Sequence, residues 1–283
     1  MKKIAVIPNP SKDCGLKITS LICKKLISFG IDVYIEEKNE LGIDEVRFYT
    51  TLPKDTELII VVGGDGSVLD ASVQAISVDA PILGVNLGRV GYLSEVEPDN
   101  LDILDRLISG EYKIEEKMLL SVACKTVNKT VTCTRLAVND IIISHDNFLG
   151  IADFRLEAGN GEFVKYRADG MILSTPAGCT AYSLSAGGPI IAHDVDSIIA
   201  TPICPHSFFN RSIIFNPTEI IKVRNGGATP LNISVDGRCF SKINSGDECV
   251  VSQADKKLKM LTFSENNMFS TLFKKMKILE DIT

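Results

Sequence analysis

Two common site types have no signature in this sequence. The eight cysteines form no Cys-x-x-Cys pair, and the three histidines lie far apart without zinc-type spacing, so we expect no structural metal. The net charge is −6 and no basic stripe is interleaved with aromatic residues, so we expect no nucleic-acid partner. Any anionic ligand must therefore be bound by local geometry.

Long apolar segments are also missing. No run approaches the roughly 18 apolar residues of a membrane span, and the apolar run at the N-terminus is too short for a signal peptide. We therefore expect a cytoplasmic protein without a membrane partner. Its cysteines are expected to be reduced and buried as small apolar side chains.

The remaining composition is that of a compact globular chain. Of its 283 residues, 45% are hydrophobic and 23% are charged, which excludes wholesale disorder. This length suits one large domain or two of ordinary size. A change of pattern along the chain favours two, although no repeat or low-complexity linker separates them.

The first part of the chain, residues 1–115, alternates apolar β-branched runs with segments of helical period. The apolar runs are expected to form strands at residues 4–7, 31–35, 58–62 and 81–85. Apolar residues between the first two recur at helical spacing, and later helices are expected at 65–77 and 98–109. This pattern is typical of an open parallel sheet covered by helices, which is a Rossmann-like α/β domain.

From about Met118 the pattern changes, and residues 116–265 are expected to form a β-rich, mostly antiparallel domain. Short runs rich in Val, Ile and Thr predict its strands: residues 119–127, 130–138, 140–144, 154–157, 163–166, 171–174, 213–215, 220–223, 232–235, 248–252 and 259–263. Helical period then returns. A C-terminal helix over about 266–283 is therefore predicted to pack back on the first domain.

The most informative stretch is residues 58–69, where an apolar strand leads into Gly63-Gly64-Asp65-Gly66-Ser67. Glycines let a phosphate approach the backbone closely, and a following helix turns its N–H groups toward the anion. A carboxylate repels phosphate, so Asp65 is expected either to steer a metal or to accept a proton from an attacking hydroxyl. The alternative is that Asp65 or Ser67 only caps the helix.

This loop lacks the lysine of a Walker loop, and Leu69 excludes the dinucleotide Gly-x-Gly-x-x-Gly pattern. Counter-charge must come from a bound Mg²⁺ or from basic residues elsewhere, and Arg89 in the second glycine-rich loop is a candidate. The alternative for Arg89 is a solvated loop charge. Because neighbouring parallel strands share one crevice at their carboxyl ends, the two loops are expected to flank one ligand.

Three segments of the second half are candidate binding elements. Residues 169–189 place hydroxyl groups on a short helical turn that suits a base or ribose, or they form only a tight connection between strands. The pair Asn139-Asp140 suits an adenine edge, or forms an Asx turn. Residues 234–238 predict a hairpin turn. Cys179 has no histidine near it in sequence and is not expected to be a nucleophile.

Taken together, these motifs resemble those of the NAD kinases, specifically the bacterial type. The Gly-Gly-Asp-Gly loop, the Asn-Leu-Gly-x-x-Gly loop, the Asn-acidic pair and the Thr-Pro-x-Gly-x-Thr-Ala-Tyr-Ser segment occur in that order over most of the chain. The resemblance implies that ATP, with Mg²⁺ on its phosphates, phosphorylates the adenosine ribose 2′-hydroxyl of NAD to give NADP. It also implies the two-domain fold described above, with the C-terminal helix rejoining the first domain.

The same resemblance implies roles for single residues. Asp65 would accept the proton of the 2′-hydroxyl, and ATP would be bound by Gly63, Gly64, Gly66, Ser67 and Arg89. NAD would be bound by Asn139, Asp140, Arg167, Asp169, Ala177, Thr180, Ala181, Tyr182, Ser185 and Asp236. Asp169 would reach its site across a subunit boundary, in a homodimer or homotetramer with shared sites.

Some positions depart from the family pattern. Ser67 stands where threonine is usual, Asp140 where glutamate is usual, and Ala177 and Cys179 where hydroxyl residues are common. Ala177 removes a hydrogen bond to the base, so we expect the difference in NAD affinity and not in turnover.

Two other functions stay open on the residues alone. The first is a phosphofructokinase-like or lipid kinase, because these kinases also contain the Gly-Gly-Asp-Gly loop. The second is a catalytically silent NAD-binding sensor, although a sensor would need no carboxylate beside phosphates. The sequence does not choose between ATP and polyphosphate or between NAD and NADH. It also leaves open whether NADPH regulates the protein.

Overall fold

The computed structural model describes residues 1–39, 41–88, 91–145, 151–159, 161–206, 209–263 and 272–273. The chain divides into two compact units: Met1–Glu116 together with the chain from Leu258 onward, and Lys117–Lys257. Two long strands, β6 (Lys113–Lys125) and β17 (Glu248–Thr262), contribute residues to both units.

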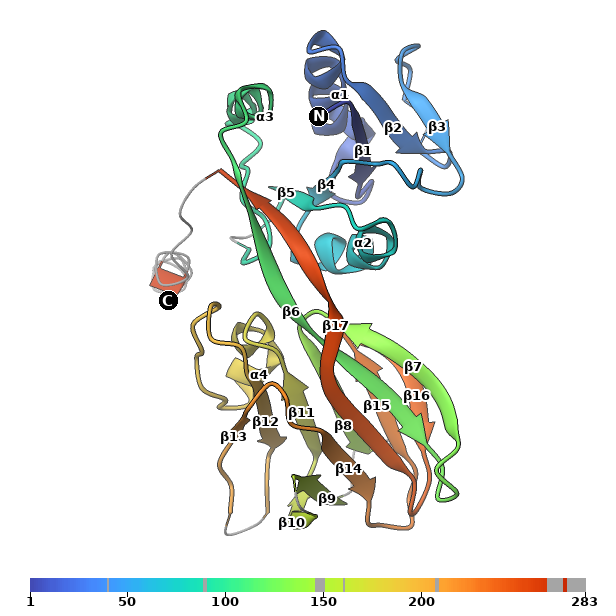
Figure 1. Cartoon of the computed structure of the whole chain (residues 1–283), viewed down its shortest axis with the longest axis vertical. Helices are drawn as coiled ribbons and strands as arrows, with labels where there is room; N and C mark the ends of the chain where they lie inside the picture. Colours follow the sequence, from blue (N-terminus) through green and yellow to red (C-terminus); the bar gives the residue numbers. More distant parts are fainter. Residues whose placement is uncertain are drawn as a thin grey trace. The chain divides into compact units, whose positions relative to one another are not determined.

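The first unit is built on a parallel sheet with the strand order β5-β4-β1-β2-β3 (Figure 1). Its strands are β1 (Lys3–Pro8), β2 (Asp32–Glu36), β3 (Arg47–Tyr49), β4 (Leu58–Gly63) and β5 (Ile82–Asn86). The end of β17 adds a parallel bridge between Met260 and Ile82. All residues of β4 are buried, which explains its unbroken apolar sequence.

Helices pack on this sheet and close its core. Helix α1 (Lys17–Ser28) packs on β1 and β2, and α2 (Asp65–Val78) packs on β4 and β5. The buried residues of α1 include Ile22, Cys23 and Leu26, at the helical spacing that predicts this helix. The parallel sheet and the helices at residues 18–29 and 65–77 are confirmed.

The predicted helix at 98–109 is confirmed in part, because the chain is helical from Leu101 to Ser109 but not at residues 98–100. This segment consists of a 3₁₀ helix, η2 (Leu101–Asp105), followed by a single α-helical turn, α3 (Arg106–Ser109). Another short 3₁₀ helix, η1 (Cys14–Leu16), precedes α1. Leu101, Leu104 and Leu107 recur every third residue, a spacing that places them on one face of a 3₁₀ helix and of a short α-helical turn alike. Gly110, with φ of 76°, ends the segment.

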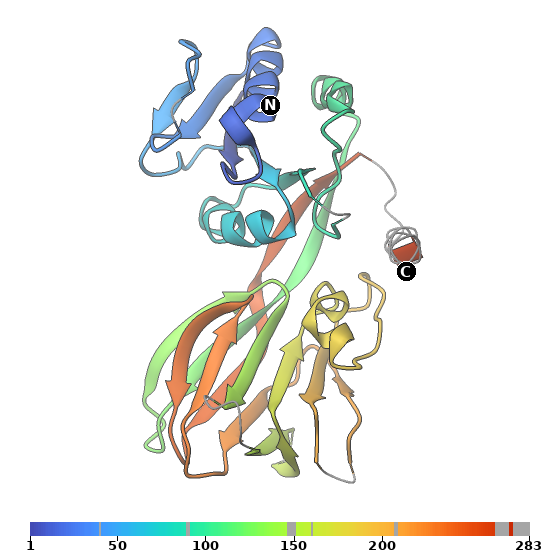
Figure 2. The ribbon, with the colours of Figure 1, turned by 180° about the vertical axis from the view of Figure 1, so that it is seen from behind.

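The second unit is antiparallel, as predicted. One sheet has the order β13-β12-β11-β8-β15-β16, seen in Figure 2 from gold through yellow-green to orange. Further antiparallel pairs join β10 to β9, β9 to β14, β14 to β17, and β6 to β7. The strands not yet defined are β7 (Val131–Ala137), β8 (Asp140–His145), β9 (Ala152–Ala158), β10 (Glu162–Ala168), β11 (Gly170–Ser174), β12 (Ile198–Ile203), β13 (Ile213–Phe215), β14 (Ile221–Asn225), β15 (Leu231–Val235) and β16 (Arg238–Ile243).

Three strands, β3, β12 and β16, were not predicted, and two of the predicted strands form one continuous strand. β3 is short, and β16 is an edge strand in which half of the residues are polar. β12 contains Pro202, but β13 pairs only with Ile198–Ala200, so the proline nitrogen interrupts no ladder on that side. The runs at 248–252 and 259–263 belong to the continuous strand β17.

Two other expectations have different outcomes. The predicted C-terminal helix lies outside the described residues, apart from positions 272–273. All eight cysteines are free thiols, but the expectation that they are buried is wrong for Cys14, Cys204 and Cys239, which are exposed.

Candidate active site

The Gly63–Ser67 loop lies at the carboxyl end of β4, where the chain passes directly into α2. Gly63 ends β4 and pairs with Asn86 at the end of β5. Gly64 precedes the helix in an extended conformation, and both glycines are buried. An added Cβ on Gly63 would lie 2.3 Å from Ser67 Oγ. Glycine at this position therefore lets the loop fold back tightly on its own helix.

Asp65 joins this loop to the second glycine-rich loop. Its carboxylate accepts hydrogen bonds from Tyr92 N at 2.9 Å and from Leu93 N at 3.1 Å. An added Cβ on Gly91 would lie 2.1 Å from Asp65 Oδ1, so glycine leaves room for the carboxylate. The two loops thus lie side by side, as the shared strand ends predict. The hydrogen bonds of the Asp65 carboxylate go to this loop and not to the first turn of α2.

The loop after β1 completes this part of the site, although none of its residues was among the predicted site residues. Asn9 Nδ2 donates to Ser67 Oγ at 2.8 Å, so Ser67 also bonds to another loop instead of capping α2. Lys12 Nζ lies 2.6 Å from the point where a Cβ on Gly64 would stand, and 3.3 Å from that point on Gly88. The signal was available, because residues 9–12 directly follow a strand of the same parallel sheet.

In the second unit, Asn139 and Asp140 lie against the turn that follows β11. Thr175 N donates to Asn139 O at 2.9 Å, and Thr175 Oγ1 donates to Val138 O at 2.7 Å. An added Cβ on Gly178 would lie 2.0 Å from Asn139 O, so only glycine permits this approach. The structure thus brings together two of the predicted binding segments, and Thr175, which was not among the predicted residues, joins them.

Asp236 holds the Asn139-Asp140 pair from the other side. It occupies the predicted hairpin turn between β15 and β16, with a positive φ of 48°. Its carboxylate accepts from Val138 N at 2.8 Å, Asn139 N at 2.7 Å and Asp140 N at 3.1 Å. The hairpin prediction is confirmed, and the Asp236 side chain is directed at the backbone of residues 138–140.

The two carboxylates of this cluster share a buried environment. Asp140 is only 4% exposed, and burial, with the nearby charge of Asp236, raises its pKa to about 7. Burial also raises the pKa of Asp236, against the opposing effect of its three backbone hydrogen bonds. The cluster therefore contains a carboxyl group that changes charge near neutral pH.

The segment after β11 forms a short 3₁₀ turn, η3 (Gly178–Thr180), and a single helical turn, α4 (Tyr182–Ser185). Ala177 is buried, Thr180 and Ala181 are half-buried, and Tyr182 and Ser185 are exposed. This matches the short helical turn expected there, with two of its predicted contact residues open to solvent. Cys179 is buried beside the backbone of Ile191, and burial raises its pKa, so it is a poor nucleophile.

Arg167 and Asp169 are not part of this cluster. Along β11, Ser174 pairs with Asp140, whereas Gly170 pairs with Ser144 at the other end. At about 3.3 Å per residue, Asp169 is separated from Asp140 by the length of the strand. Asp169 lies 3.9 Å from His145 Nε2, and Arg167 Nε lies 3.4 Å from Asp153.

Three further findings limit what can be said of the site and of the chain. Arg89 lies outside the described residues. Within the described ranges, no group of three or more His, Cys, Asp or Glu side chains could hold a metal ion by itself. No helix in the described part of the chain is long and apolar enough to cross a membrane.

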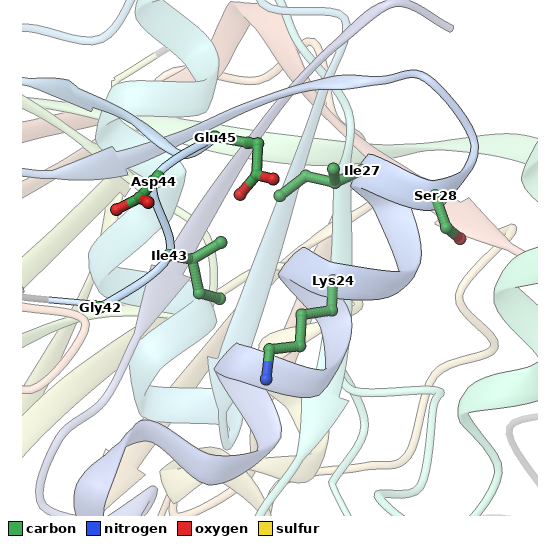
Figure 3. Close-up of a pocket in the computed structure, with 7 residues that line it drawn as sticks. All are labelled: Lys24, Ile27, Ser28, Gly42, Ile43, Asp44 and Glu45. Carbon is green, nitrogen blue, oxygen red and sulfur yellow. The ribbon is translucent and has the colours of Figure 1, made fainter.

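A separate pocket of about 420 Å³ lies in the first unit, between α1 and residues 42–45 (Figure 3). It is lined by Lys24, Ile27, Ser28, Gly42, Ile43, Asp44 and Glu45. None of the predicted site residues lines it. Its lining carries no glycine loop or hydroxyl cluster of the kind found at the strand ends, so we do not place the active site there.

Comparisons with known proteins match this organisation. Residues 4–112 match the ATP-NAD kinase N-terminal domain, and residues 138–263 match the ATP-NAD kinase C-terminal domain. The NAD kinase of Natranaerobius thermophilus is 34% identical over 282 residues, covering 98% of each chain. The NAD kinase of Thermoanaerobacter pseudethanolicus is 35% identical over 277 residues, covering 96% of this chain and 98% of that protein.

Two solved structures share the fold. Yeast NADH kinase complexed with NADH has a TM-score of 0.84 and 24% identity, over 98% of this chain and 88% of that one. An NAD kinase from Archaeoglobus fulgidus in complex with ATP has a TM-score of 0.70 and 22% identity, over 96% of this chain and 99% of that one. At these identities the likeness concerns the fold alone.

Proposed function

The chain belongs to the ATP-NAD kinase family, a family of phosphotransferases, and from this premise we propose which reaction it catalyses. The reaction is transfer of the terminal phosphoryl group of ATP to the 2′-hydroxyl of the adenosine ribose of NAD, giving NADP and ADP. The observation that carries the proposal is the position of Asp65. It follows two buried glycines at the carboxyl end of β4, beside the second glycine loop.

We propose that the first unit binds the phosphates of ATP. Gly63, Gly64 and Gly66 remove the Cβ atoms that would keep phosphates from the backbone, and α2 directs its N-terminus toward them. We propose that Mg²⁺ enters bound to ATP as a co-substrate, since kinases hold Mg²⁺ largely through substrate phosphates. Arg89, in the second loop, is proposed to add positive charge at the same edge.

Asp65 is proposed to accept the proton of the 2′-hydroxyl as the new bond to phosphorus forms. Its two hydrogen bonds from Tyr92 N and Leu93 N fix the carboxylate, while each oxygen keeps a lone pair for the substrate. In phosphoryl transfer most of the rate comes from positioning and charge neutralisation. The backbone bonds that hold Asp65 in one orientation therefore support the role.

We propose that residues of the second unit bind NAD. Asn139 and Asp140 are proposed to bind NAD directly, with Thr180, Ala181, Tyr182 and Ser185 around adenine and its ribose, and Ala177 at the base. Asp236 is proposed to contribute through the backbone of residues 138–140, which its carboxylate contacts.

Arg167 and Asp169 are proposed to complete the site of a second copy of the chain. Their place at the opposite end of β11 from Asp140 supports this assignment. The protein would then be a homodimer or homotetramer. The shared site is tested by mixing Asp65→Asn protein with Asp169→Asn protein. Mixed oligomers contain some sites in which both residues are intact, so we expect the mixture to regain activity. Mixtures that stay as inactive as either parent would overturn the shared site.

The function is tested by incubating the protein with NAD and MgATP and measuring NADP with a coupled dehydrogenase. Parallel reactions replace NAD by NADH, ATP by polyphosphate, or the acceptor by sugars or diacylglycerol, and one series adds NADPH. We expect NADP from NAD and MgATP. Phosphorylation of a sugar or lipid without NADP would favour the other kinases, and NAD binding without any product would favour a sensor. Cell fractionation tests the proposed cytoplasmic location.

A further inference from the structure

The glycine loop at the end of β4 has no lysine within it, yet a phosphate chain needs positive charge nearby. The loop after β1 brings one there. Lys12 Nζ lies 2.6 Å from the Cβ position on Gly64 and 3.3 Å from that on Gly88. A side chain at Gly64 would displace this ammonium group, and one at Gly88 would crowd it. Lys12 therefore occupies space that both glycine loops leave open.

The backbone that carries Lys12 is fixed on both sides. Asn9 bonds to Ser67 in the glycine loop, and Asn9 N donates to Val62 O at 2.8 Å. Asn9 O accepts from Lys12 N at 3.0 Å and from Asp13 N at 2.9 Å. Asp13 is buried, and its carboxylate accepts from Ile18 N and Thr19 N at the start of α1. The position of Lys12 beside the glycine loops is thus built into the turn.

Among the described residues, the Lys12 ammonium has no ion-pair partner. The side chain is exposed, and within the described ranges no carboxylate forms an ion pair with it. By contrast, Lys25, on the neighbouring helix α1, pairs with Asp102 at 2.7 Å and Asp105 at 2.9 Å. An unpaired cation beside backbone that lacks Cβ atoms is suited to a phosphate oxygen.

We propose that Lys12 binds the phosphates of the phosphoryl donor, supplying from the β1 loop the charge that the Gly63–Ser67 loop lacks. This inference rests on the proposed kinase function. The contact is to the phosphate chain, which ATP and inorganic polyphosphate share, and not to the nucleoside.

The test compares Lys12→Gln and Lys12→Arg with Lys24→Gln. Lys24 is also exposed, but it lies on α1 beside the separate pocket, so its substitution matches the change in net charge. We expect Lys12→Gln to raise the KM for ATP about tenfold, the usual effect of losing a charged hydrogen bond. The KM for NAD and the melting temperature should stay unchanged. Lys12→Arg should recover most of the ATP affinity, and Lys24→Gln should match the wild type.

A binding experiment separates this inference from the proposed function. Calorimetry with tripolyphosphate and with ATP needs no turnover, so it reports on Lys12 even if no NADP is made. Equal weakening of both ligands in Lys12→Gln supports a phosphate contact. Wild-type affinity for both, weakening of ATP alone, or an equal rise in the KM for NAD would each overturn the inference.

Discussion

The two units of this chain assemble polar residues in different ways. In the first unit the site residues follow parallel strands, so three loops meet at one sheet edge while each remains a short continuous segment. In the second unit the cluster joins residues 138–140, 175–178 and 236, which are far apart in the chain. The first arrangement fixes a carboxylate beside glycine loops, and the second fixes a strand end through buried backbone bonds. We therefore expect substitutions at Asp65 and at the residues that hold it to affect turnover, and those in the cluster of the second unit to affect NAD affinity and stability.

The sharpest test of this division is Asp65→Asn. Loss of a general base lowers rates by about 10²–10⁴, so kcat should fall by that range while the dissociation constant for NAD stays near the wild-type value. The asparagine oxygen still accepts one of the two loop hydrogen bonds, which limits structural damage. Asp44→Asn, an exposed aspartate beside the separate pocket, is the charge-matched control. Unchanged turnover in Asp65→Asn would reduce Asp65 to a link between loops.

The comparison becomes direct with one methyl group added to each unit. In Gly91→Ala the new Cβ would stand 2.1 Å from Asp65 Oδ1, and in Gly178→Ala it would stand 2.0 Å from Asn139 O. A displacement of about 1 Å at a reacting group costs on the order of 10² in rate. Gly91→Ala should therefore lower kcat by that order, while Gly178→Ala should mainly raise the KM for NAD.

The matched controls for these alanines are Gly42 and Gly227. An added Cβ on Gly42 meets nothing within 4 Å, and one on Gly227 meets only Asn225 Oδ1 at 3.7 Å. Both alanine variants should have wild-type kinetics. If Gly178→Ala lowered kcat and left the KM for NAD unchanged, the division of roles between the units would be wrong.

Asp236→Asn tests the anchor of the second unit. Asparagine tolerates the positive φ at this turn, so the substitution leaves the backbone preference intact. It removes one acceptor from the three backbone N–H groups that converge on the carboxylate. An unsatisfied buried N–H costs about 1–3 kcal/mol. Denaturant unfolding should show this loss in the free energy of unfolding, and kinetics should show a higher KM for NAD with little change in kcat. Wild-type stability would contradict the anchoring role.

The smallest effect, taken per unit of pH, is a dependence of stability on pH from Asp140. Its pKa is raised from 3.8 to about 7 by burial and by Asp236, so between these values the folded chain holds a proton that the unfolded chain releases. Stability from this group is therefore greatest below about pH 4 and is lost as pH rises toward 7. The slope is at most about 1.4 kcal/mol per pH unit. Asp140→Asn should remove this component of the unfolding free energy between pH 4 and 7, and identical slopes in the two proteins would contradict it.

Much of the first unit could be predicted because the residues that indicate each strand and turn are adjacent in the sequence. An apolar run followed by glycines predicts a buried strand and a tight turn, and parallel strands place successive loops at one edge. The same rule also extends to the loop after β1, which holds Asn9 and Lys12. Those residues were missed because Asn9-Pro10-Ser11-Lys12 has no glycine and does not look like a phosphate loop by composition.

The second unit was readable only in part. Alternating short runs predicted most of its strands, but β12 and β16 carry a proline or polar residues that hide the pattern. Asp236 was recognised as part of a turn, while the target of its carboxylate was not. A turn signal depends on four adjacent residues, whereas the target depends on which strand lies next to the hairpin.

The sequence by itself determined the family, the division into an α/β part and a β-rich part, and the glycine loop with its single carboxylate. Each of these depends on neighbouring residues and their local conformational preferences. Only the tertiary structure placed Lys12 over Gly64 and Gly88, turned Asp236 toward the backbone of residues 138–140, and separated Asp169 from Asp140 along β11. These placements follow from strand order and register, which are set by packing over the whole sheet and not by any local segment.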